Sequence, residues 1–518
     1  MNSLRHLISL LLVAFSLCTV HAQELFQNPV IRTDLADPSV IRFNGAYYAS
    51  GTSSEWAPFY PVYMSTDLVN WVQVGHVFEQ KPDWTESSFW APELYVYNNK
   101  VYCYYSARRK SDHRSFIGVA VSDTPEHAFE DKGELITIGS ECIDAFVYND
   151  NGQLYITWKA YGLDPRPIEI LCSRLSSDGL HLEGEPFTLL TDEESIGMEG
   201  QCIIHQGDWY YLLYSARGCC GPGSDYEVRV ARSKTITGPF QKYSDNPILM
   251  CSDDFQSCGH GTVTTTPEGS LYYLCHSYQH GARFYMGRQP IVQELVFGSD
   301  QWPHFKTGRL ATSRQPMPSE GIRQGEWTQF ADKFSSDKLG VSWTWNYTFC
   351  DVKAEVNGDG QLLLSGNGIK EPDAAALCQR TPDTDYCFAV NVLNHGPSMR
   401  GIVLYGDAGN YVALVLRGNK LQTVSRCNGK ETILSDIPMK QRNIRLQAEV
   451  KDSRTLTFKY DDGHGMKELE PFSVDASHTL PWDRVARPGL ISAVLADSKE
   501  KPAAFSDFKM WKRQTGSF

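Results

Sequence analysis

The stretch that decides the fold is Ile196-Gly-Met-Glu-Gly-Gln-Cys-Ile-Ile-His-Gln-Gly-Asp-Trp-Tyr-Tyr-Leu-Leu-Tyr214. A glutamate, an apolar run, a glycine turn and an aromatic run follow one another, which is typical of two antiparallel strands joined by a tight turn. Counting back eight residues from the turn glycine reaches Glu199, and the same count from two other turn glycines reaches Asp37 and Asp144. The repeated frame therefore predicts three carboxylates at one equivalent position of a repeated unit.

The frame belongs to a unit that recurs five times. The repeats begin near Asp37, Trp90, Ile143, Met198 and Gly259. Each repeat contains a first strand, a short polar turn, an aromatic strand, a third strand and a weaker fourth strand. Four strands in a unit of roughly 50 to 60 residues indicate a propeller blade, and five such blades close a ring around a channel. We therefore predict an all-β protein in which residues 23–305 form a five-bladed β-propeller.

The pattern changes after the fifth repeat. Residues 306–326 are polar and contain two prolines and two glycines between Lys306 and Gly321, which predicts a linker. Residues 327–518 carry short alternating strands separated by turns such as Asn357-Gly-Asp-Gly360, which favours a β-sandwich of the jelly-roll type. Two domains also suit a chain of 518 residues, which is too long for one ordinary core.

The three aligned carboxylates point to hydrolytic chemistry. In a propeller the first strand of each blade lines the channel, so Asp37, Asp144 and Glu199 are expected to converge near its mouth. Like charges held close raise one another's pKa and are poorly solvated, so such a cluster usually serves a function. Glycoside cleavage needs one protonated carboxyl for the leaving oxygen and one ionised carboxylate for water. This chemistry is our leading hypothesis for the site.

Aromatic side chains near the same mouth suit a sugar ligand. Trp90 begins the second repeat, and Trp56 and Phe59 lie on a loop inside the first. A flat ring stacks well on the apolar face of a sugar, so we predict that these three residues bind substrate. Each ring would suit a hydrophobic core equally well.

Charge and the N-terminal segment limit the partners and the location. The formal net charge is -13, without a block of basic residues, so nucleic acid is not an expected partner. Residues 1–22 combine Arg5 and His6, an apolar run and small residues at Val20-His-Ala22, as in a signal peptide that is cleaved near Gln23. No later stretch is long and apolar enough for a membrane span. We expect a secreted or periplasmic protein.

The cysteines do not form a dense framework. Removing the leader leaves an odd number of the 14 cysteines, scattered over both halves of the chain, and most of them suit buried apolar positions. Their spacing does not fit a zinc site. Bridges between Cys219 and Cys220, or between Cys251 and Cys258, stay open at this point.

Several motifs together resemble glycoside hydrolase family 43. They are Ala36-Asp37-Pro-Ser-Val, Trp90-Ala-Pro-Glu93, Ile143-Asp144, Glu199-Gly, Ser233-Lys-Thr-Ile-Thr-Gly-Pro-Phe240 and Gly287-Arg288-Gln. The resemblance covers about Asn28 to Phe305. The C-terminal region is similar to the concanavalin-like sandwich that some members, including β-xylosidases, carry after the propeller.

The resemblance implies inverting hydrolysis of β-D-xylosides, α-L-arabinofuranosides, arabinan or some galactans. Matched by motif, Asp37 would be the general base, Glu199 the general acid, and Asp144 the residue that tunes the acid and holds the sugar. Arg288 would hydrogen-bond near the base or the substrate. His260 matches a histidine that in some members faces a calcium ion or a water cluster, although a lone histidine also suits a hydrogen-bonded core. The resemblance implies no required cofactor beyond such a structural calcium.

We expect an exported exo-acting enzyme that releases terminal arabinofuranose or xylose from plant oligosaccharides or polysaccharides, and we favour arabinofuranose. A β-xylosidase or an arabinan- or galactan-acting enzyme is the alternative within the family. A retaining fructosidase-like hydrolase would need an Asn-Asp-Pro-Asn-Gly motif where Ala36-Asp37-Pro-Ser stands. A sugar-binding propeller without catalysis predicts that one of the three acids is replaced, and all three are present.

Overall fold

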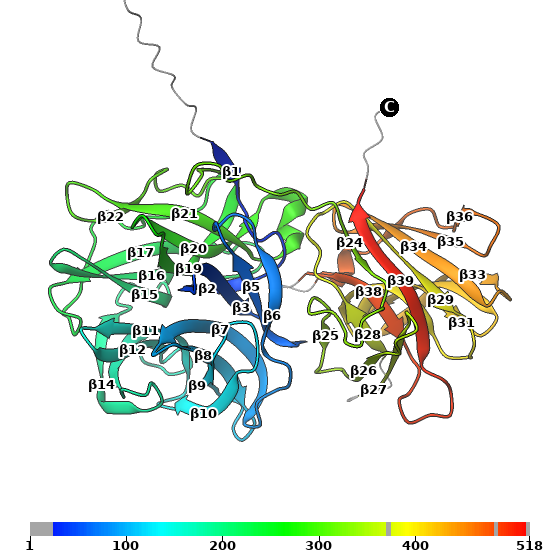
Figure 1. Cartoon of the computed structure of the whole chain (residues 1–518), viewed down its shortest axis with the longest axis horizontal. Coiled ribbons are helices and arrows are strands. Elements are labelled where there is room, and N and C mark those ends of the chain that lie inside the picture. Colours follow the sequence, from blue (N-terminus) through cyan, green and yellow to red (C-terminus); the bar gives the residue numbers. More distant parts are fainter. Residues whose placement is uncertain (1–23, 369–373, 481–484, 514–518) are drawn as a thin grey trace, which may run out of the picture.

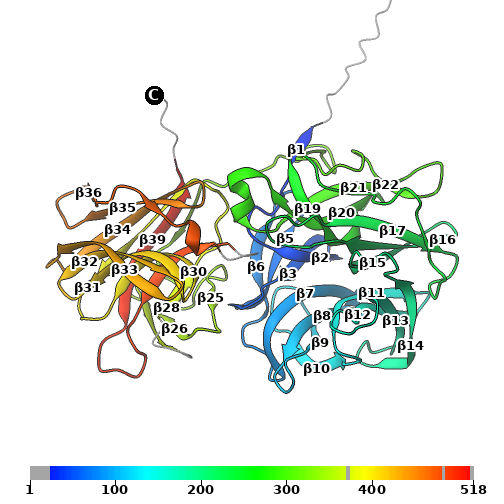
Figure 2. The same ribbon diagram turned by 180° about the vertical axis from the view of Figure 1, so that it is seen from behind.

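The computed structural model describes residues 24–368, 374–480 and 485–513, which form two domains built of β-strands (Figures 1 and 2). The predicted architecture, a five-bladed propeller followed by a β-sandwich, is confirmed. The predicted leader, residues 1–22, lies outside the described residues. Within the three described ranges, no helix is long and apolar enough to span a bilayer.

The propeller consists of five antiparallel sheets of four strands, and each sheet follows chain order from the channel outward. Blade 1 contains β2 (Ala36–Phe43), β3 (Ala46–Thr52), β5 (Phe59–Ser65) and β6 (Val72–Phe78). Blade 2 contains β7 (Thr85–Tyr97), β8 (Lys100–Arg109), β9 (Ser115–Ser122) and β10 (Glu130–Ile136). Blade 3 contains β11 (Cys142–Asp150), β12 (Gln153–Ala160), β13 (Glu169–Leu175) and β14 (Leu182–Thr191). Blade 4 contains β15 (Glu199–Gln206), β16 (Trp209–Ala216), β17 (Glu227–Ser233) and β18 (Gln241–Lys242). Blade 5 contains β19 (Phe255–Thr265), β20 (Leu271–Gln279), β21 (Gln289–Phe297) and β22 (Pro303–Phe305).

Apolar packing between neighbouring blades holds the ring together. In β8, Tyr102 and Tyr104 pack against blade 3, whereas Cys103 and Tyr105 pack toward blade 1. Successive side chains of a strand point to opposite faces, so a strand between two blades is apolar on both sides. This explains the aromatic runs of the second strands.

The ring closes between blades 5 and 1 by packing and by a short added strand pair. Tyr47 of β3 and Leu274 of β20 belong to the core that joins these blades. The strand β1 (Leu25–Gln27) pairs with β23 (Arg314–Pro316), which lies inside the segment expected to be a linker. Met317 also packs on this core, so the segment 306–326 runs along the propeller.

The C-terminal domain consists of two stacked sheets. The larger sheet contains β24 (Gln329–Asp332), β26 (Cys350–Val356), β27 (Leu362–Gly368), β29 (Tyr386–Leu393), β34 (Asn443–Lys451), β35 (Thr455–Asp461), β36 (Met466–Glu468), β37 (Val474–Asp475) and β39 (Ala503–Lys512). The smaller sheet contains β28 (Ala375–Cys378), β30 (Arg400–Asp407), β31 (Asn410–Arg417), β32 (Lys420–Cys427), β33 (Lys430–Pro438) and β38 (Arg487–Ser492). In β30, Leu404 faces the core between the sheets and Tyr405 faces a second cluster that includes Trp56 of the propeller.

The two domains join at blade 1, and this contact corrects two predictions. The short strand β4 (Trp56–Ala57) pairs with β25 (Trp345–Asn346) of the C-terminal region. Trp56 is only 2% exposed, and its ring meets Tyr405 edge-on at 6.1 Å. Phe59 is also 2% exposed and packs on Phe89 at 4.2 Å between ring centroids. The prediction that Trp56 and Phe59 stack on a sugar is therefore wrong, because both rings are buried in cores.

Each inner strand carries a bulge near the channel mouth. In every blade the strand register shifts there, and the residue at the shift nearest the following turn takes a left-handed backbone with φ between 38° and 60°. These residues are Asp37, Ala91, Asp144, Gly200 and His260. Aspartate, histidine and glycine tolerate this conformation better than most residues, and a bulge re-aims the neighbouring side chains.

The bulges correct the predicted alignment of Glu199. In the turn after β2 the glycine is the second turn residue, because Phe43 pairs with Ala46. In blade 4 the glycine is the first turn residue, because Gln206 pairs with Trp209. The bulge residue of blade 4 is therefore Gly200, and Glu199 lies one position earlier than the two aspartates. A one-residue offset changes where a side chain points, so Glu199 approaches the axis differently.

Glycine at position 200 has a steric cause. Gly200 has φ +57°, and a Cβ atom there would lie 2.7 Å from Cγ of His260. His260, the bulge residue of the next blade, occupies the volume that a side chain would need. Blade 4 therefore carries its acid on the preceding residue.

The cysteines show one bridge in the described ranges. Cys219 and Cys220 form a disulfide between adjacent residues. Cys251 and Cys258 are both free thiols, so a bridge between them is ruled out. The Cys258 side chain is buried in the core between blades 4 and 5.

Replacing Trp56 by alanine tests its structural role. Removing a buried tryptophan should cost roughly 3 to 5 kcal/mol of folding free energy and lower the Tm. Phe472→Ala is the matched control, because Phe472 is 55% exposed and its loss should leave Tm nearly unchanged. Differential scanning calorimetry measures both. An unchanged Tm for Trp56→Ala together with weaker sugar binding would restore the sugar-platform interpretation.

The pair Gly200→Ala and Gly207→Ala tests the packing of His260. Both glycines have φ near +60°, but a Cβ on Gly207 would have open space around it. Gly207→Ala should therefore cost only the backbone strain, about 1 kcal/mol, whereas Gly200→Ala should cost roughly 1 to 3 kcal/mol more because it overpacks the core. Urea unfolding of the two variants measures the difference. Equal losses would mean that the His260 contact is unimportant for stability.

Candidate active site

The channel mouth brings together the three acids predicted from the sequence. His260 links two of them, because its Nδ1 lies 3.6 Å from Oδ1 of Asp37 and 3.7 Å from Oδ2 of Asp144. The backbone N–H of Gly200, next to Glu199, donates to Oδ2 of Asp144 at 3.1 Å. The structure thus places Asp37, Asp144 and Glu199 around one short stretch of the axis.

Asp37 is held by donors on both carboxylate oxygens. Nη1 of Arg288 donates to Oδ1 at 3.0 Å, and the family resemblance implied a hydrogen bond of Arg288 near the proposed base or the substrate. The hydroxyl of Thr52 donates to Oδ2 at 2.6 Å. The Asp37 N–H donates to Nδ1 of His276 at 3.0 Å, which fixes the backbone of the bulge. Asp37 therefore has a fixed orientation.

The surroundings of Asp37 keep it ionised. Burial raises the pKa of Asp37, but the adjacent Arg288 guanidinium lowers it, and the net pKa lies well below its usual range. Burial also lowers the pKa of His276 to about 4, although Asp37 opposes this, so the ring is neutral at physiological pH. An ionised carboxylate at this position suits the activation of a water molecule.

Asp144 occupies the same bulge position in blade 3 but has the opposite electrostatic character. Burial raises the pKa of Asp144 to about 7; His260 opposes this shift and Glu199 adds to it. Asp37 has an arginine within hydrogen-bond distance, whereas Asp144 accepts from backbone N–H groups such as that of Gly200. Two aspartates at equivalent positions thus differ in protonation because their neighbours differ.

Glu199 is the most accessible of the three acids. Its side chain is 22% exposed, compared with 11% for Asp37 and 6% for Asp144. The Tyr226 hydroxyl donates to Oε1 at 3.1 Å, and Nζ of Lys159 lies 3.4 Å from Oε2. A partly exposed carboxyl group can meet a leaving group more readily than a deeply buried one.

Lys159 is a site residue that the sequence interpretation missed. It bridges Glu199 and Glu141, with Nζ 3.6 Å from Oε2 of Glu141. Burial opposes its charge, but the carboxylates of Glu199 and Glu141 together raise the pKa of Lys159 above its usual value. The lysine is therefore charged, and it supplies a cation on the acid side of the pocket.

Lys159 belongs to a second ring of polar residues at equivalent positions on the second strands. The ring consists of Thr52, Ser106, Lys159, Ser215 and His276, each opposite the residue that precedes a bulge. Four of them accept the bulge N–H of the next blade, at 2.7 to 3.1 Å. Lys159 is the exception, because the N–H of Gly200 donates to Asp144 instead. Counting forward eight residues from the first turn residue would have found most of this ring.

The C-terminal domain reaches the wall behind Asp37. Oδ1 of Asp34 accepts the N–H of Arg288 at 3.1 Å, and a guanidinium nitrogen of Arg487 lies 3.9 Å from Oδ2 of Asp34. Arg487, at the start of β38, also stacks on the Trp56 ring at 3.8 Å. The sandwich domain therefore braces the residue that holds Asp37.

Trp90 is the one predicted sugar platform that remains partly exposed. It lies opposite Ser106 in blade 2, as Glu199 lies opposite Ser215 in blade 4, so both side chains leave equivalent positions of their strands. Substrate stacking on Trp90 stays a prediction.

His260 faces carboxylates that already have donors. Calcium prefers six to eight oxygen ligands. Throughout the described ranges, no group of three or more histidine, cysteine or acidic side chains is arranged to hold a metal ion. The metal role of His260 stays a prediction.

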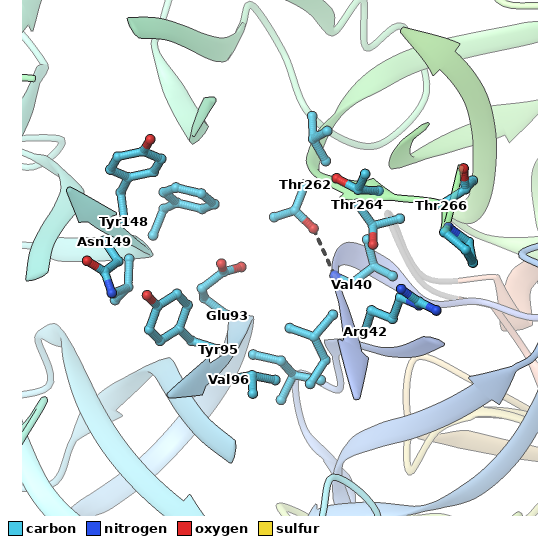
Figure 3. A pocket seen from close by; sticks show the side chains of 17 residues that line it. Val40, Arg42, Glu93, Tyr95, Val96, Tyr148, Asn149, Thr262, Thr264 and Thr266 are labelled. Atoms are coloured by element: carbon cyan, nitrogen blue, oxygen red, sulfur yellow. Dashed lines mark hydrogen bonds between the residues drawn. The ribbon is translucent and has the colours of Figure 1, made fainter. Parts of the chain in front are cut away.

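A separate cavity of about 540 Å³ lies at the turn end of the channel, away from the three acids (Figure 3). Its wall includes Glu93, Tyr95, Tyr148 and Thr264. Burial raises the pKa of Glu93 to about 8, so this side chain is protonated at neutral pH. Glu93 is the one acid among the lining residues, and Arg42 is the one basic residue. The cavity therefore does not offer the paired carboxylates of the channel mouth.

Comparison with known proteins agrees with this geometry. The family model Glycosyl hydrolases family 43 matches residues 26–303, and the model Beta xylosidase C-terminal Concanavalin A-like domain matches residues 331–510. Xylosidase/arabinosidase 43B of Humicola insolens is 26% identical over 398 residues, which is 72% of each chain. Non-reducing end alpha-L-arabinofuranosidase BoGH43B of Bacteroides ovatus is 25% identical over 432 residues, which is 78% of each chain.

Solved structures share the whole two-domain fold. The GH43 protein BlXynB from Bacillus licheniformis superposes with a TM-score of 0.80 at 20% identity and covers 95% of this chain and 100% of its own. The xylan beta-1,4-xylosidase from Bacillus halodurans gives a TM-score of 0.81 at 20% identity, with 94% of this chain and 100% of its own covered. The family model covers more than half of the sequence and contains all three acids. The chain therefore belongs to glycosyl hydrolases family 43 and is a glycosidase.

Proposed function

We propose that this glycosidase is an exported, exo-acting and inverting enzyme that releases terminal L-arabinofuranose, or D-xylose, from plant polysaccharides or their oligosaccharides. The observation that carries the proposal is the contrast between Asp37, held ionised beside Arg288, and the more exposed Glu199. Export is supported by the leader-like pattern of residues 1–22. The relatives named arabinofuranosidase and xylosidase define the two candidate sugars.

In the proposed mechanism Asp37 removes a proton from a water molecule, whose oxygen forms a bond to the anomeric carbon. The glycosidic bond breaks in the same step, and Glu199 gives its proton to the departing oxygen. Asp144 lies beside Glu199, whose carboxylate adds to the raised pKa of Asp144, and it can hydrogen-bond a sugar hydroxyl. The two protons balance, and this reaction requires no cofactor.

A sugar-binding propeller without catalysis is the candidate from another class. It requires a site in which the acids are lost or turned away from the pocket. Here Asp37 and Glu199 are both present and both hydrogen-bonded in place. Hydrolysis is therefore the better proposal.

A panel of 4-nitrophenyl glycosides tests the substrate and the stereochemistry. We expect hydrolysis of the α-L-arabinofuranoside or the β-D-xyloside, and NMR of the first-formed sugar should show the inverted anomer, because a water molecule fits between the base and the sugar in inverting sites. Asp37→Asn, purified in parallel, controls for contaminating glycosidases. A retained anomer would contradict the mechanism, and no hydrolysis of any glycoside would contradict the function.

Replacing Glu199 by glutamine tests the role of the acid. General acid catalysis contributes roughly 100- to 10,000-fold, so Glu199→Gln should lose about that much on a disaccharide, whose leaving group is poor. The loss on a dinitrophenyl glycoside should be far smaller, because that phenolate departs with little protonation. Asp37→Asn is the control and should slow both substrates alike, since every substrate needs activated water. For Asp144→Asn, the difference in rate loss between the two substrates should lie between those of Glu199→Gln and Asp37→Asn. Equal losses of Glu199→Gln on both substrates would assign the acid to another residue.

A further inference from the structure

The disulfide between Cys219 and Cys220 lies in the loop 217–226 of blade 4, between β16 and β17. Strand β16 pairs antiparallel with β15, where Ser215 lies opposite Glu199. It also pairs with β17, where Ala216, the last residue of β16, lies opposite Glu227. The loop therefore leaves the sheet at the end of the channel where Glu199 stands. Strand register, independently of any loop contact, places the two ends of this loop at the mouth of the site.

The loop is anchored to the elements that carry the acids and their partners. The hydroxyl of Ser257, on the inner strand that also carries His260, donates to the carbonyl oxygen of Cys219 at 2.7 Å. The N–H of Gly221 donates to the hydroxyl of Tyr278 at 3.1 Å. At the end of the loop, Tyr226 donates to Glu199 and stacks on His276 at 5.6 Å.

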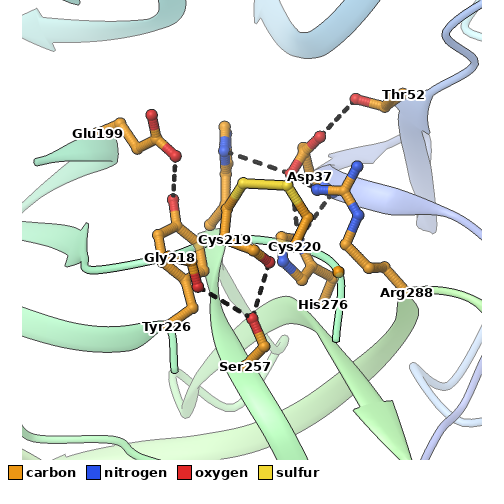
Figure 4. The surroundings of a disulfide bond; sticks show 12 residues. Asp37, Thr52, Glu199, Gly218, Cys219, Cys220, Tyr226, Ser257, His276 and Arg288 are labelled. Atoms are coloured by element: carbon orange, nitrogen blue, oxygen red, sulfur yellow. Dashed lines mark hydrogen bonds and ion pairs between the residues drawn. A yellow bond between two sulfur atoms is a disulfide. The ribbon is translucent and has the colours of Figure 1, made fainter. Parts of the chain in front are cut away.

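The disulfide is surrounded by catalytic groups. Figure 4 shows it with Glu199 and Tyr226 on one side and Asp37 and Arg288 on the other. Both cysteines are partly exposed, whereas nine of the eleven free cysteines in the described ranges are buried. The sulfur atoms are an apolar, polarizable surface among charged and hydrogen-bonding groups.

A pentose needs such a surface. Its hydroxyl groups bind to carboxylates and guanidinium groups, but its C–H face is apolar and gains by contact with an apolar wall. Trp56 and Phe59, the aromatic candidates of blade 1, are buried elsewhere. The disulfide offers an apolar surface beside the acids.

We propose that the Cys219–Cys220 disulfide is part of the sugar-binding wall, where it contacts the apolar face of the glycosyl unit held by Asp37 and Glu199. This inference rests on the proposed function and deepens it, because it assigns a specificity-determining contact of the same site. Reduction by a dithiol breaks the S–S bond, transfers two electrons and two protons to the cysteines, and converts the dithiol to its own disulfide. The two thiols then move independently, so the wall loses its fixed shape and binds the sugar more weakly, although the thiols still lie beside it.

The first arm of the test is kinetic. Treatment with dithiothreitol, and separately the variant Cys219→Ser/Cys220→Ser, should each raise KM for the hydrolysed nitrophenyl glycoside by about tenfold with kcat changed much less, because a lost apolar contact weakens binding of the sugar. Reoxidation of the reduced wild type should restore KM. Cys427→Ser is the matched control, because Cys427 is an exposed free thiol on the C-terminal domain.

The second arm does not depend on the folding of a variant. Reduced wild-type protein is alkylated with iodoacetamide in the presence or absence of the released pentose, and mass spectrometry measures modification at Cys219, Cys220 and Cys427. The pentose should protect Cys219 and Cys220 and leave Cys427 unprotected.

Unchanged KM after reduction, or equal alkylation with and without the pentose, would overturn the inference while hydrolysis by the oxidised protein still supports the proposed function. If the oxidised protein hydrolyses no glycoside, the proposed function fails, and the inference fails with it.

Discussion

The hydrogen bond between a bulge N–H and the polar side chain of the preceding blade is the contact on which the site depends. A bulge leaves one backbone N–H without a partner in its own sheet, and a buried N–H without a partner is costly. Ser106 meets this need for Asp144, and Ser215 meets it for His260. The same contact that ties two blades together thus orients the side chain of the bulge residue.

This arrangement allows one repeated geometry to hold groups of different character. Asp37 and Asp144 share a position, yet Arg288 stands beside one and Glu199 acts on the other. Blade 4 departs from the repeat because His260 fills the space beside Gly200. The acid moves to residue 199, and the bulge N–H of Gly200 binds Asp144 directly. The repeated bulge position thus carries carboxylates whose surroundings differ from blade to blade.

The C-terminal domain is part of this construction. Its Arg487 packs on Trp56 and faces Asp34, which in turn holds the backbone of Arg288. The chain of contacts ends at Asp37. These contacts give the sandwich a mechanical role in holding the position of Asp37.

The sequence by itself determined the all-β class, the five repeats, the change of pattern near residue 327 and the three acids, because strand period and turn residues are local properties. Only the tertiary structure decided the position of Glu199 relative to its bulge, the burial of Trp56 and Phe59, and the presence of Lys159 beside the acid. Counting from a glycine could not show which turn position it fills. Burial and ion pairing depend on contacts between residues far apart in the chain, such as Trp56 with Tyr405, and local patterns do not contain them.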